Sequence, residues 1–102
     1  QYQYEFAESA DEALEVIEEL VKDNVKIVVI VSDWLMPGMK GDELLILIHQ
    51  RFPEVTTILL TGQADREAVE RAINEAKIYA YLTKPWNTKE LIETIRSGIS
   101  KS

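Results

Sequence analysis

The chain has 102 residues, 46% hydrophobic and 28% charged, a composition typical of one compact globular domain. It contains no cysteine, which excludes disulfides, thiolate metal sites and a cysteine nucleophile, and makes the cytosol its natural compartment. Its 18 acidic residues outnumber 11 basic ones, and the net charge of −7 disfavours direct binding to nucleic acid. No apolar run, Ile27 to Val31 included, is long enough to cross a membrane, and no secretory signal is visible.

The amino-terminal part of the chain predicts a strand, a helix and a second strand. Residues 2–7 alternate weakly in polarity and predict the first strand. Ser9 followed by Glu12 is the capping-box pattern that begins a helix. The apolar side chains of this helix share one face: Ala13, Leu14, Ile17, Leu20 and Val21. Ile27 to Val31 is β-branched throughout, which is typical of a strand covered on both faces of a parallel sheet.

The rest of the chain continues the alternation of helices and strands. It predicts a helix from about Asp42 to Arg51, a strand over Thr57–Leu60, a helix beginning at Asp65, a strand over Tyr79–Leu82 and a final helix capped by Asn87. Helices of this length between parallel strands imply right-handed crossovers. The fold class is therefore α/β, an open doubly wound parallel sheet between two helix layers, in which ligands bind beyond the carboxyl ends of the strands.

Three residues with chemically functional side chains follow the buried strands: Asp33, Thr61 and Lys84. Because neighbouring strands lie about 4.8 Å apart, a carboxylate, a hydroxyl and an ammonium are expected to gather at one edge of the sheet. A carboxylate can act as a nucleophile toward phosphorus, and the transferred group then needs positive charge and hydrogen-bond donors. Asp33 is therefore a candidate nucleophile, with Lys84 and Thr61 as candidate partners of the phosphoryl oxygens.

Each of these residues also has a structural explanation. An Asp after a strand often forms a turn or caps a helix, a Thr can bond to nearby backbone, and a Lys is usually solvated. Trp34 and Trp86 flank the three positions, either as rim contacts for a partner or as packing aromatics. The shared position at three strand ends, rather than any residue alone, favours the functional interpretation.

Three segments around these residues resemble the signature of a known family. Asp33 to Gly41 (DWLMPGMKG) is similar to the Asp motif of response-regulator receiver domains. Leu60-Thr61-Gly62 resembles the Thr segment of that family, and Tyr81 to Trp86 (YLTKPW) resembles its Lys-Pro segment. The spacing of the motifs also matches, and the resemblance covers residues 1–102. It implies a flavodoxin-like fold, a single receiver domain and a role in two-component signalling.

The resemblance assigns roles to the matching positions. Asp33 would accept a phosphoryl group from the phosphohistidine of a histidine kinase or phosphotransfer protein. Thr61 would bond to the new phosphoryl group, Lys84 would pair with it, and Tyr81 would turn inward when Thr61 moves. These roles imply a phosphoacceptor that assists its own phosphorylation, and not an enzyme acting on exogenous substrates. The Lys84–Pro85 bond is expected to be cis.

The resemblance also implies a magnesium site, with Asp33 and the backbone carbonyl of Leu35 as ligands. A complete receiver opens with a strand ending in an acidic pair, followed by a helix. Here residues 2–7 and the helix after Ser9 match the second strand and second helix of the family. The first strand, the first helix and the acidic ligands are therefore expected to be missing. Asp33 alone is then a poor magnesium site, and one edge and one apolar face of Ile27 to Val31 should lie uncovered.

Three explanations of the amino end stay open. The missing segment exists in the parent protein, or a second chain fills the gap by strand exchange or homodimerisation. Alternatively, the strand over residues 2–7 moves beside the Ile27 strand and brings Glu8 toward Asp33 as a substitute ligand. Glu8 is otherwise a solvated residue that precedes a helix cap.

Two other functions compete with the phosphoacceptor. A receiver-like fold can serve as a docking or dimerisation module without being phosphorylated. A small hydrolase could use Asp33 as a nucleophile on exogenous phosphoesters, but no general base stands near Asp33 in the sequence.

Overall fold

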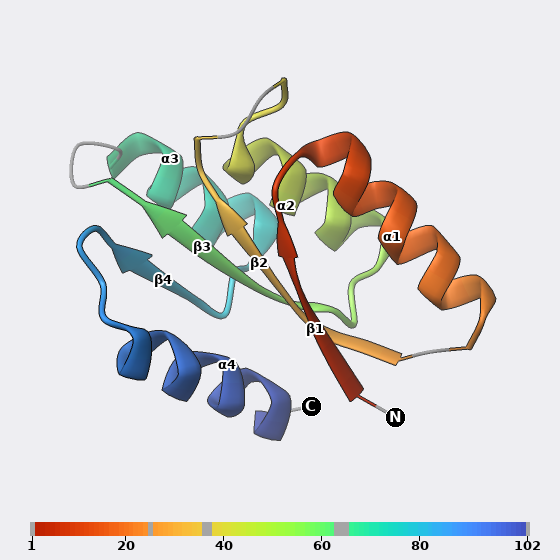
Figure 1. Cartoon of the computed structure of the whole chain (residues 1–102). Helices are drawn as coiled ribbons and strands as arrows, with labels where there is room; N and C mark the ends of the chain where they lie inside the picture. Colours follow the sequence, from red (N-terminus) through yellow and green to blue (C-terminus); the bar gives the residue numbers. More distant parts are fainter. Residues whose placement is uncertain (1, 25, 36–37, 63–65, 102) are drawn as a thin grey trace.

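The computed structural model describes residues 2–24, 26–35, 38–62 and 66–101, in which strands and helices alternate along the chain (Figure 1). The elements in order are β1 (Tyr2–Ala7), α1 (Ala10–Lys22), β2 (Lys26–Asp33), α2 (Gly41–Arg51), β3 (Thr56–Thr61), α3 (Arg66–Arg71), η1 (Ala72–Ala76), β4 (Ala80–Thr83) and α4 (Thr88–Lys101). None of the helices in these ranges is long and apolar enough to cross a membrane. The predicted succession of strands and helices is confirmed.

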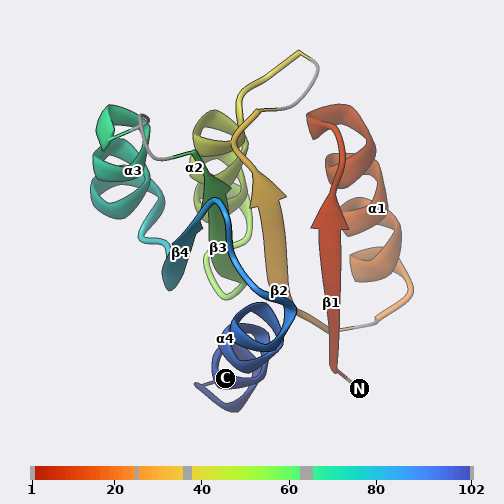
Figure 2. The ribbon, with the colours of Figure 1, turned by 60° about the vertical axis from the view of Figure 1, so that its left-hand side comes forward.

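The four strands form one parallel sheet in the order β1-β2-β3-β4. Among the described helices, α4 alone lies on one face of this sheet, while α1, α2 and α3 lie on the other (Figure 2). The prediction of a flavodoxin-like α/β fold with helices on both faces is confirmed.

Alternate side chains of the central strands enter two separate hydrophobic clusters. Ile30 of β2 and Leu59 of β3 face α1 and α2, where they join the larger cluster. The smaller cluster lies under α4 and contains Val29, Val31, Ile58, Leu60 and Ile95. Because successive side chains of a strand point to opposite faces, the unbroken apolar sequence of β2 is what a strand between two helix layers requires.

Side chains begin two helices as the sequence predicted. The Glu12 amide donates to the Ser9 hydroxyl over 3.2 Å at the start of α1. The Glu90 amide donates to the Asn87 side-chain oxygen over 2.7 Å at the start of α4. Each bond satisfies a backbone donor that has no partner inside its helix.

The element boundaries differ from the predicted ones in several places. Helix α2 begins at Gly41 instead of Asp42, and β2, β3 and β4 are longer or shifted by one or two residues. The helix predicted after Asp65 runs without a gap from Arg66 to Ala76, but it changes type on the way. It consists of α3 and a π-helical turn, η1, which ends at Lys77 in the left-handed region with a φ of 52°. The predicted cap Asp65 lies outside the described residues.

The expectation that one edge and one face of Ile27 to Val31 would lie uncovered is wrong. Strand β1 pairs in parallel with β2 along that edge, from Tyr4 opposite Val29 to Ala7 opposite Ser32, with a register irregularity after Gln3. On the α4 face, Val29 and Val31 are buried. The physical reason is that an unpaired edge exposes a row of backbone donors and acceptors, and β1 is a strand able to satisfy them. This is the strand placement of the third explanation given for the amino end.

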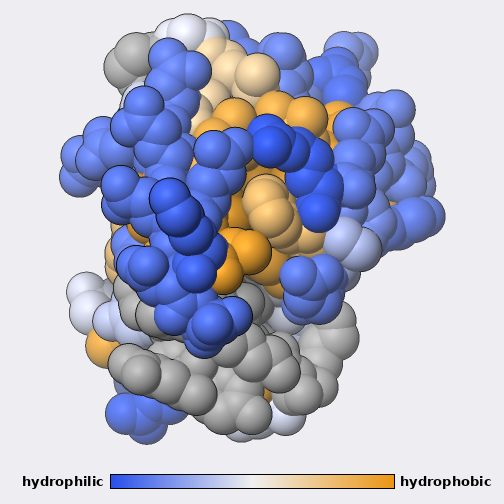
Figure 3. All heavy atoms as spheres, turned by 90° about the vertical axis from the view of Figure 1, so that its right-hand side faces the viewer, coloured by the Kyte–Doolittle hydropathy of each residue, from blue (hydrophilic) through white to orange (hydrophobic). Residues whose placement is uncertain are grey.

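Because β1 is an edge strand, part of its apolar surface stays exposed. Tyr4 and Phe6 are 48% and 49% exposed, and their rings meet edge to face with centroids 5.8 Å apart. Tyr4 also lines a groove with Ile92, Ile95 and Ile99 of α4. Figure 3 shows the side of the molecule that lies to the right in Figure 1. Apolar surface is also visible there between hydrophilic side chains.

Candidate functional site

The carboxyl ends of β2, β3 and β4 bring the three candidate residues to one edge of the sheet. Asp33 ends β2 and is paired in register with Leu60, and the next residue of β3 is Thr61. Thr61 is paired with Thr83, the last residue of β4, and Lys84 follows directly. The gathering of a carboxylate, a hydroxyl and an ammonium at this edge is therefore as the sequence predicted.

Lys84 forms an ion pair with Asp33, with 3.7 Å between Nζ and Oδ2. The two side chains are 51% and 37% exposed, so the pair is open to water and to a reactant. The Lys84 amide donates to the Thr61 carbonyl over 2.9 Å, and the Lys84–Pro85 bond is cis, the geometry expected from the resemblance. The Lys84 ammonium also lies 5.9 Å from the centroid of the Trp86 ring.

The Asp33 carboxylate is oriented by the loop that follows it. Its Oδ1 accepts a hydrogen bond from the Leu35 amide over 3.1 Å, while Oδ2 faces Lys84. The Trp34 amide donates to the Leu60 carbonyl over 2.7 Å and extends the β2–β3 ladder past the end of the strand. One oxygen of Asp33 is thus fixed by backbone, and the other is directed toward a cation.

Thr61 is fully buried, and its hydroxyl donates to the Gly62 carbonyl over 3.2 Å. This is the local backbone bond that the sequence offered as the structural explanation of the residue. Tyr81 lies on β4 opposite Leu59, and 46% of it is exposed. The inward turn of Tyr81 and the bond from Thr61 to a phosphoryl group stay predictions.

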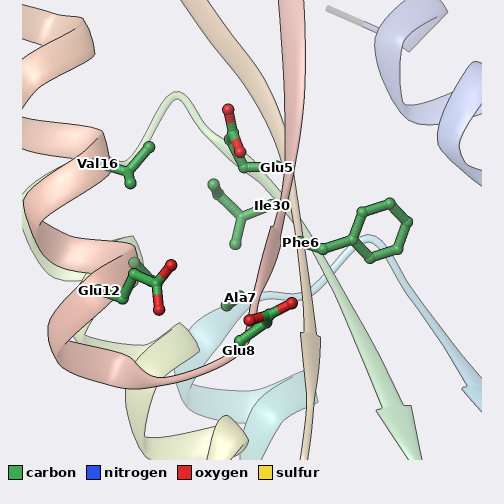
Figure 4. A pocket seen from close by; sticks show the side chains of 8 residues that line it. Glu5, Phe6, Ala7, Glu8, Glu12, Val16 and Ile30 are labelled. Carbon is green, nitrogen blue, oxygen red and sulfur yellow. The ribbon is translucent and has the colours of Figure 1, made fainter.

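The described residues do not supply a magnesium shell. They contain no group of three or more His, Cys, Asp or Glu side chains placed to hold a metal ion. Glu8 follows β1 at the same end of the sheet as Asp33, because Ala7 pairs with Ser32. Figure 4 shows Glu8 together with Glu5 and Glu12 around a pocket between β1 and α1. Asp33 and the Leu35 carbonyl remain the ligands that the resemblance assigns, and one carboxylate does not fit an octahedral site by itself.

Gly41 closes the loop that carries Asp33. Its amide donates to the Trp34 carbonyl over 2.8 Å, and a Cβ added to Gly41 would lie 2.7 Å from the Trp34 Cα. A real side chain cannot approach backbone this closely, so the first residue of α2 must be Gly for the loop to pack against the helix.

Sequence reasoning missed one group of residues beside the site. Asp42 is fully buried at the start of α2, where its Oδ1 accepts from the Trp34 indole over 2.9 Å. Its other oxygen pairs with the guanidinium of Arg71, the last residue of α3. An Asp in the first turn of a helix normally needs no partner beyond the helix itself, so nothing in the sequence distinguished Asp42.

Comparisons with known proteins agree with the fold. The sequence profile of the response regulator receiver domain matches residues 1–96. The chain is 41% identical over 71 residues to the hydrogenase transcriptional regulatory protein HoxA of Cupriavidus necator, covering 70% of this chain and 15% of the relative. It is 33% identical over 95 residues to the sensor kinase CckA of Brucella abortus, covering 93% and 10%.

Solved structures show the same relationship. The signal receiver domain of an HD domain-containing protein from Pseudomonas fluorescens Pf-5 superposes with a TM-score of 0.80 and 38% identity, covering 94% of this chain and 67% of that one. The receiver domain of NtrX from Brucella abortus superposes with a TM-score of 0.78 and 26% identity, covering 94% and 77%. The chain thus spans a small part of the curated relatives and most of the receiver structures. It belongs to the response regulator receiver domain family of two-component signalling.

Proposed function

We propose that this domain is a phosphoacceptor, and that Asp33 takes a phosphoryl group from the phosphohistidine of a histidine kinase or a phosphotransfer protein. The observation that carries the proposal is the solvent-accessible Asp33 carboxylate, with its Oδ2 3.7 Å from the ammonium of Lys84. An ion pair placed only for stability gains little at such an exposed position. A nucleophile, in contrast, must be reachable from solvent and must have positive charge beside it.

In the proposed step, a carboxylate oxygen of Asp33 attacks the phosphorus of the phosphohistidine. The new O–P bond forms as the P–N bond breaks, and the imidazole leaves with the electron pair and takes up a proton. Oδ1 is engaged by the Leu35 amide, so Oδ2 is the attacking atom that the geometry favours. The Lys84 ammonium then offsets the charge that gathers on the phosphoryl oxygens.

The switch that follows is part of the same proposal. The Thr61 hydroxyl would leave the Gly62 carbonyl and donate to a phosphoryl oxygen on the neighbouring strand, and the exposed Tyr81 ring would turn toward the space it vacates. The proposal places the domain in the cytoplasm, which the absence of cysteine supports. A role for magnesium stays outside the proposed step, because the described donors do not complete its shell.

A second candidate function is docking or dimerisation without phosphorylation. It is supported by the edge strand β1, where Tyr4 and Phe6 are half exposed on an apolar face. Light scattering after size-exclusion chromatography would give the mass of the particle. A dimer that Phe6→Ser converts to a monomer would favour this function, and a monomer at all concentrations would exclude dimerisation.

The phosphoacceptor proposal is tested with the full-length protein. It is incubated with magnesium chloride and a small phosphodonor such as phosphoramidate. Intact-mass spectrometry should show an adduct of one phosphoryl group that is labile to hydroxylamine. Asp33→Asn should abolish the adduct, while Asp23→Asn, at an exposed carboxylate at the end of α1, should leave it unchanged. An unmodified mass in the wild-type protein would contradict the proposal.

A further inference from the structure

Asp42 is a buried carboxylate that joins two distant segments of the chain. Its side chain is 1% exposed, and its oxygens are divided between two partners. Oδ1 accepts from the Trp34 indole, which belongs to the loop after β2, and Oδ2 pairs with Arg71 at the end of α3. Burying a carboxylate is unfavourable unless charge and hydrogen bonds compensate it, so both partners are needed to keep Asp42 in place.

The partner on one side belongs to the segment that orients the phosphoacceptor. Trp34 lies between Asp33 and Leu35, whose amide donates to Asp33 Oδ1. The Trp34 backbone is fixed at both ends, by the Leu60 carbonyl and the Gly41 amide. The indole bond to Asp42 is the third anchor and the one made by a side chain. The Lys40 ammonium, 5.1 Å from the Trp34 ring centroid, covers the ring.

The partner on the other side is placed by the irregular end of the third helix. Arg71 is the last residue of α3 and the first flanking residue of the π-helical turn η1. In η1, Ala72 and Ala76 are buried in the same cluster as Leu44 and Ile48 of α2. A shift of α3 or η1 against α2 therefore moves the Arg71 guanidinium relative to Asp42.

We propose that Asp42 is a positioning residue that sets the place of Trp34 and, through it, the loop that orients the Asp33 carboxylate. With Arg71 it couples that loop to α3, so that a displacement at either end is felt at the other. The effect on phosphoryl transfer rests on the proposed function of Asp33. The effect on Trp34 does not, and it can be measured in the unmodified protein.

The competing explanation is that Asp42 and Arg71 only stabilise the fold. A double variant separates the two roles. Asp42→Leu combined with Arg71→Met removes both charges and keeps the volume, and such replacements often preserve or raise stability. It also removes the acceptor of the Trp34 indole. If Asp42 and Arg71 only stabilise the fold, the double variant should behave as wild type in every assay. If Asp42 positions Trp34, the Trp34 side chain should be more exposed in the double variant than in the wild-type protein.

The first measurement uses Trp86→Phe as the background, so that Trp34 is the only tryptophan. Acrylamide quenching and the emission maximum report the exposure of Trp34. Arg71→Met and the double variant should raise the quenching constant and shift the emission to longer wavelength. Arg71→Lys should restore part of the wild-type signal, because it keeps a cation within reach. Arg51→Met is the matched control, since Arg51 has the same 46% exposure as Arg71 but pairs with the exposed Glu18.

The second measurement is the rate at which a small phosphodonor adds a phosphoryl group to the same variants, read by intact mass. The double variant should react roughly two- to thirtyfold more slowly than its background, the range that coupling along a contact network commonly spans. Thermal unfolding identifies any variant that is not folded. Wild-type quenching, emission and rate in a folded double variant would overturn the inference. If the wild-type protein takes no phosphoryl group, the proposed function fails, and the Trp34 signals alone decide the inference.

Discussion

Asp33 and Asp42 lie close together in the sequence and each is paired with a cation, yet the two carboxylates differ greatly in their exposure to solvent. Asp33 is 37% exposed and its partner Lys84 is half exposed, whereas Asp42 is buried under its partners Trp34 and Arg71. An accessible pair contributes little to stability and leaves the carboxylate free to react. A buried carboxylate, in contrast, depends on its partners, because removing one of them leaves an uncompensated buried charge and lowers the stability of the fold. The same chemical groups therefore serve reactivity at one position and architecture at the other.

The largest expected effect on stability comes from Arg71→Met. This change leaves the Asp42 carboxylate buried with the Trp34 indole as its remaining partner. Removing one member of a fully buried ion pair destabilises a protein by about 3–5 kcal/mol, and because Arg71 itself is 46% exposed we expect a loss near the lower end of that range. Urea unfolding followed by circular dichroism measures the free energy. Arg51→Met, at the surface pair with Glu18, should lower it by less than about 1 kcal/mol, and equal losses in the two variants would remove the contrast between the pairs.

A smaller loss is expected from Gly41→Ala, which tests how closely α2 approaches the Asp33 loop. The added methyl would meet the Trp34 backbone, which cannot move aside, and overpacking of this kind costs about 1–3 kcal/mol. Gly98→Ala in α4 is the control, because its Cβ would meet the side-chain methyls of Val29 and Thr56 at 3.3 Å. Chemical denaturation of both variants checks the order. A greater loss at Gly98 would contradict the close packing of the loop.

The smallest change in stability is expected from Lys84→Ala. Both members of its ion pair are exposed, so the free energy of unfolding should fall by less than about 1 kcal/mol. The rate of phosphorylation at Asp33 should nevertheless fall by roughly 10²–10³-fold, the usual effect of removing a group that stabilises developing charge. Lys89→Ala, at an exposed lysine in the first turn of α4, is the matched control. A stability loss as large as that of Arg71→Met would instead show that Lys84 has a structural role.

The parts of the fold that were predictable depend on local patterns. The β-branched run in β2, the caps Ser9 and Asn87, and the strand-end positions of Asp33 and Lys84 are each set by neighbours in the sequence. Parallel strands then bring their carboxyl ends together, so the Asp33–Lys84 pair follows from topology without any knowledge of distances.

The parts that could not be predicted depend on partners far away in the chain. Strand β1 pairs with the edge of β2, and the sequence of neither strand determines which strand edge β1 will join. The π-helical turn after Arg71 has the apolar spacing of an ordinary helix. Asp42 looks like a helix-start carboxylate until its contacts with Trp34 and Arg71 are known, because hydrogen bonding between distant residues leaves no periodic pattern.

The uneven covering of the sheet has a consequence for local unfolding. Among the described helices, α4 alone covers its face, and it is attached through a cluster with few buried members, such as Ile95. The opposite face carries the larger cluster, which several helices share. Detachment of α4 should therefore break fewer buried contacts than unfolding of the whole domain, and we expect α4 to open as a separate cooperative unit. Amide hydrogens of α4 should exchange with deuterium sooner than those of α2, and a partner bound to α4 would slow that exchange.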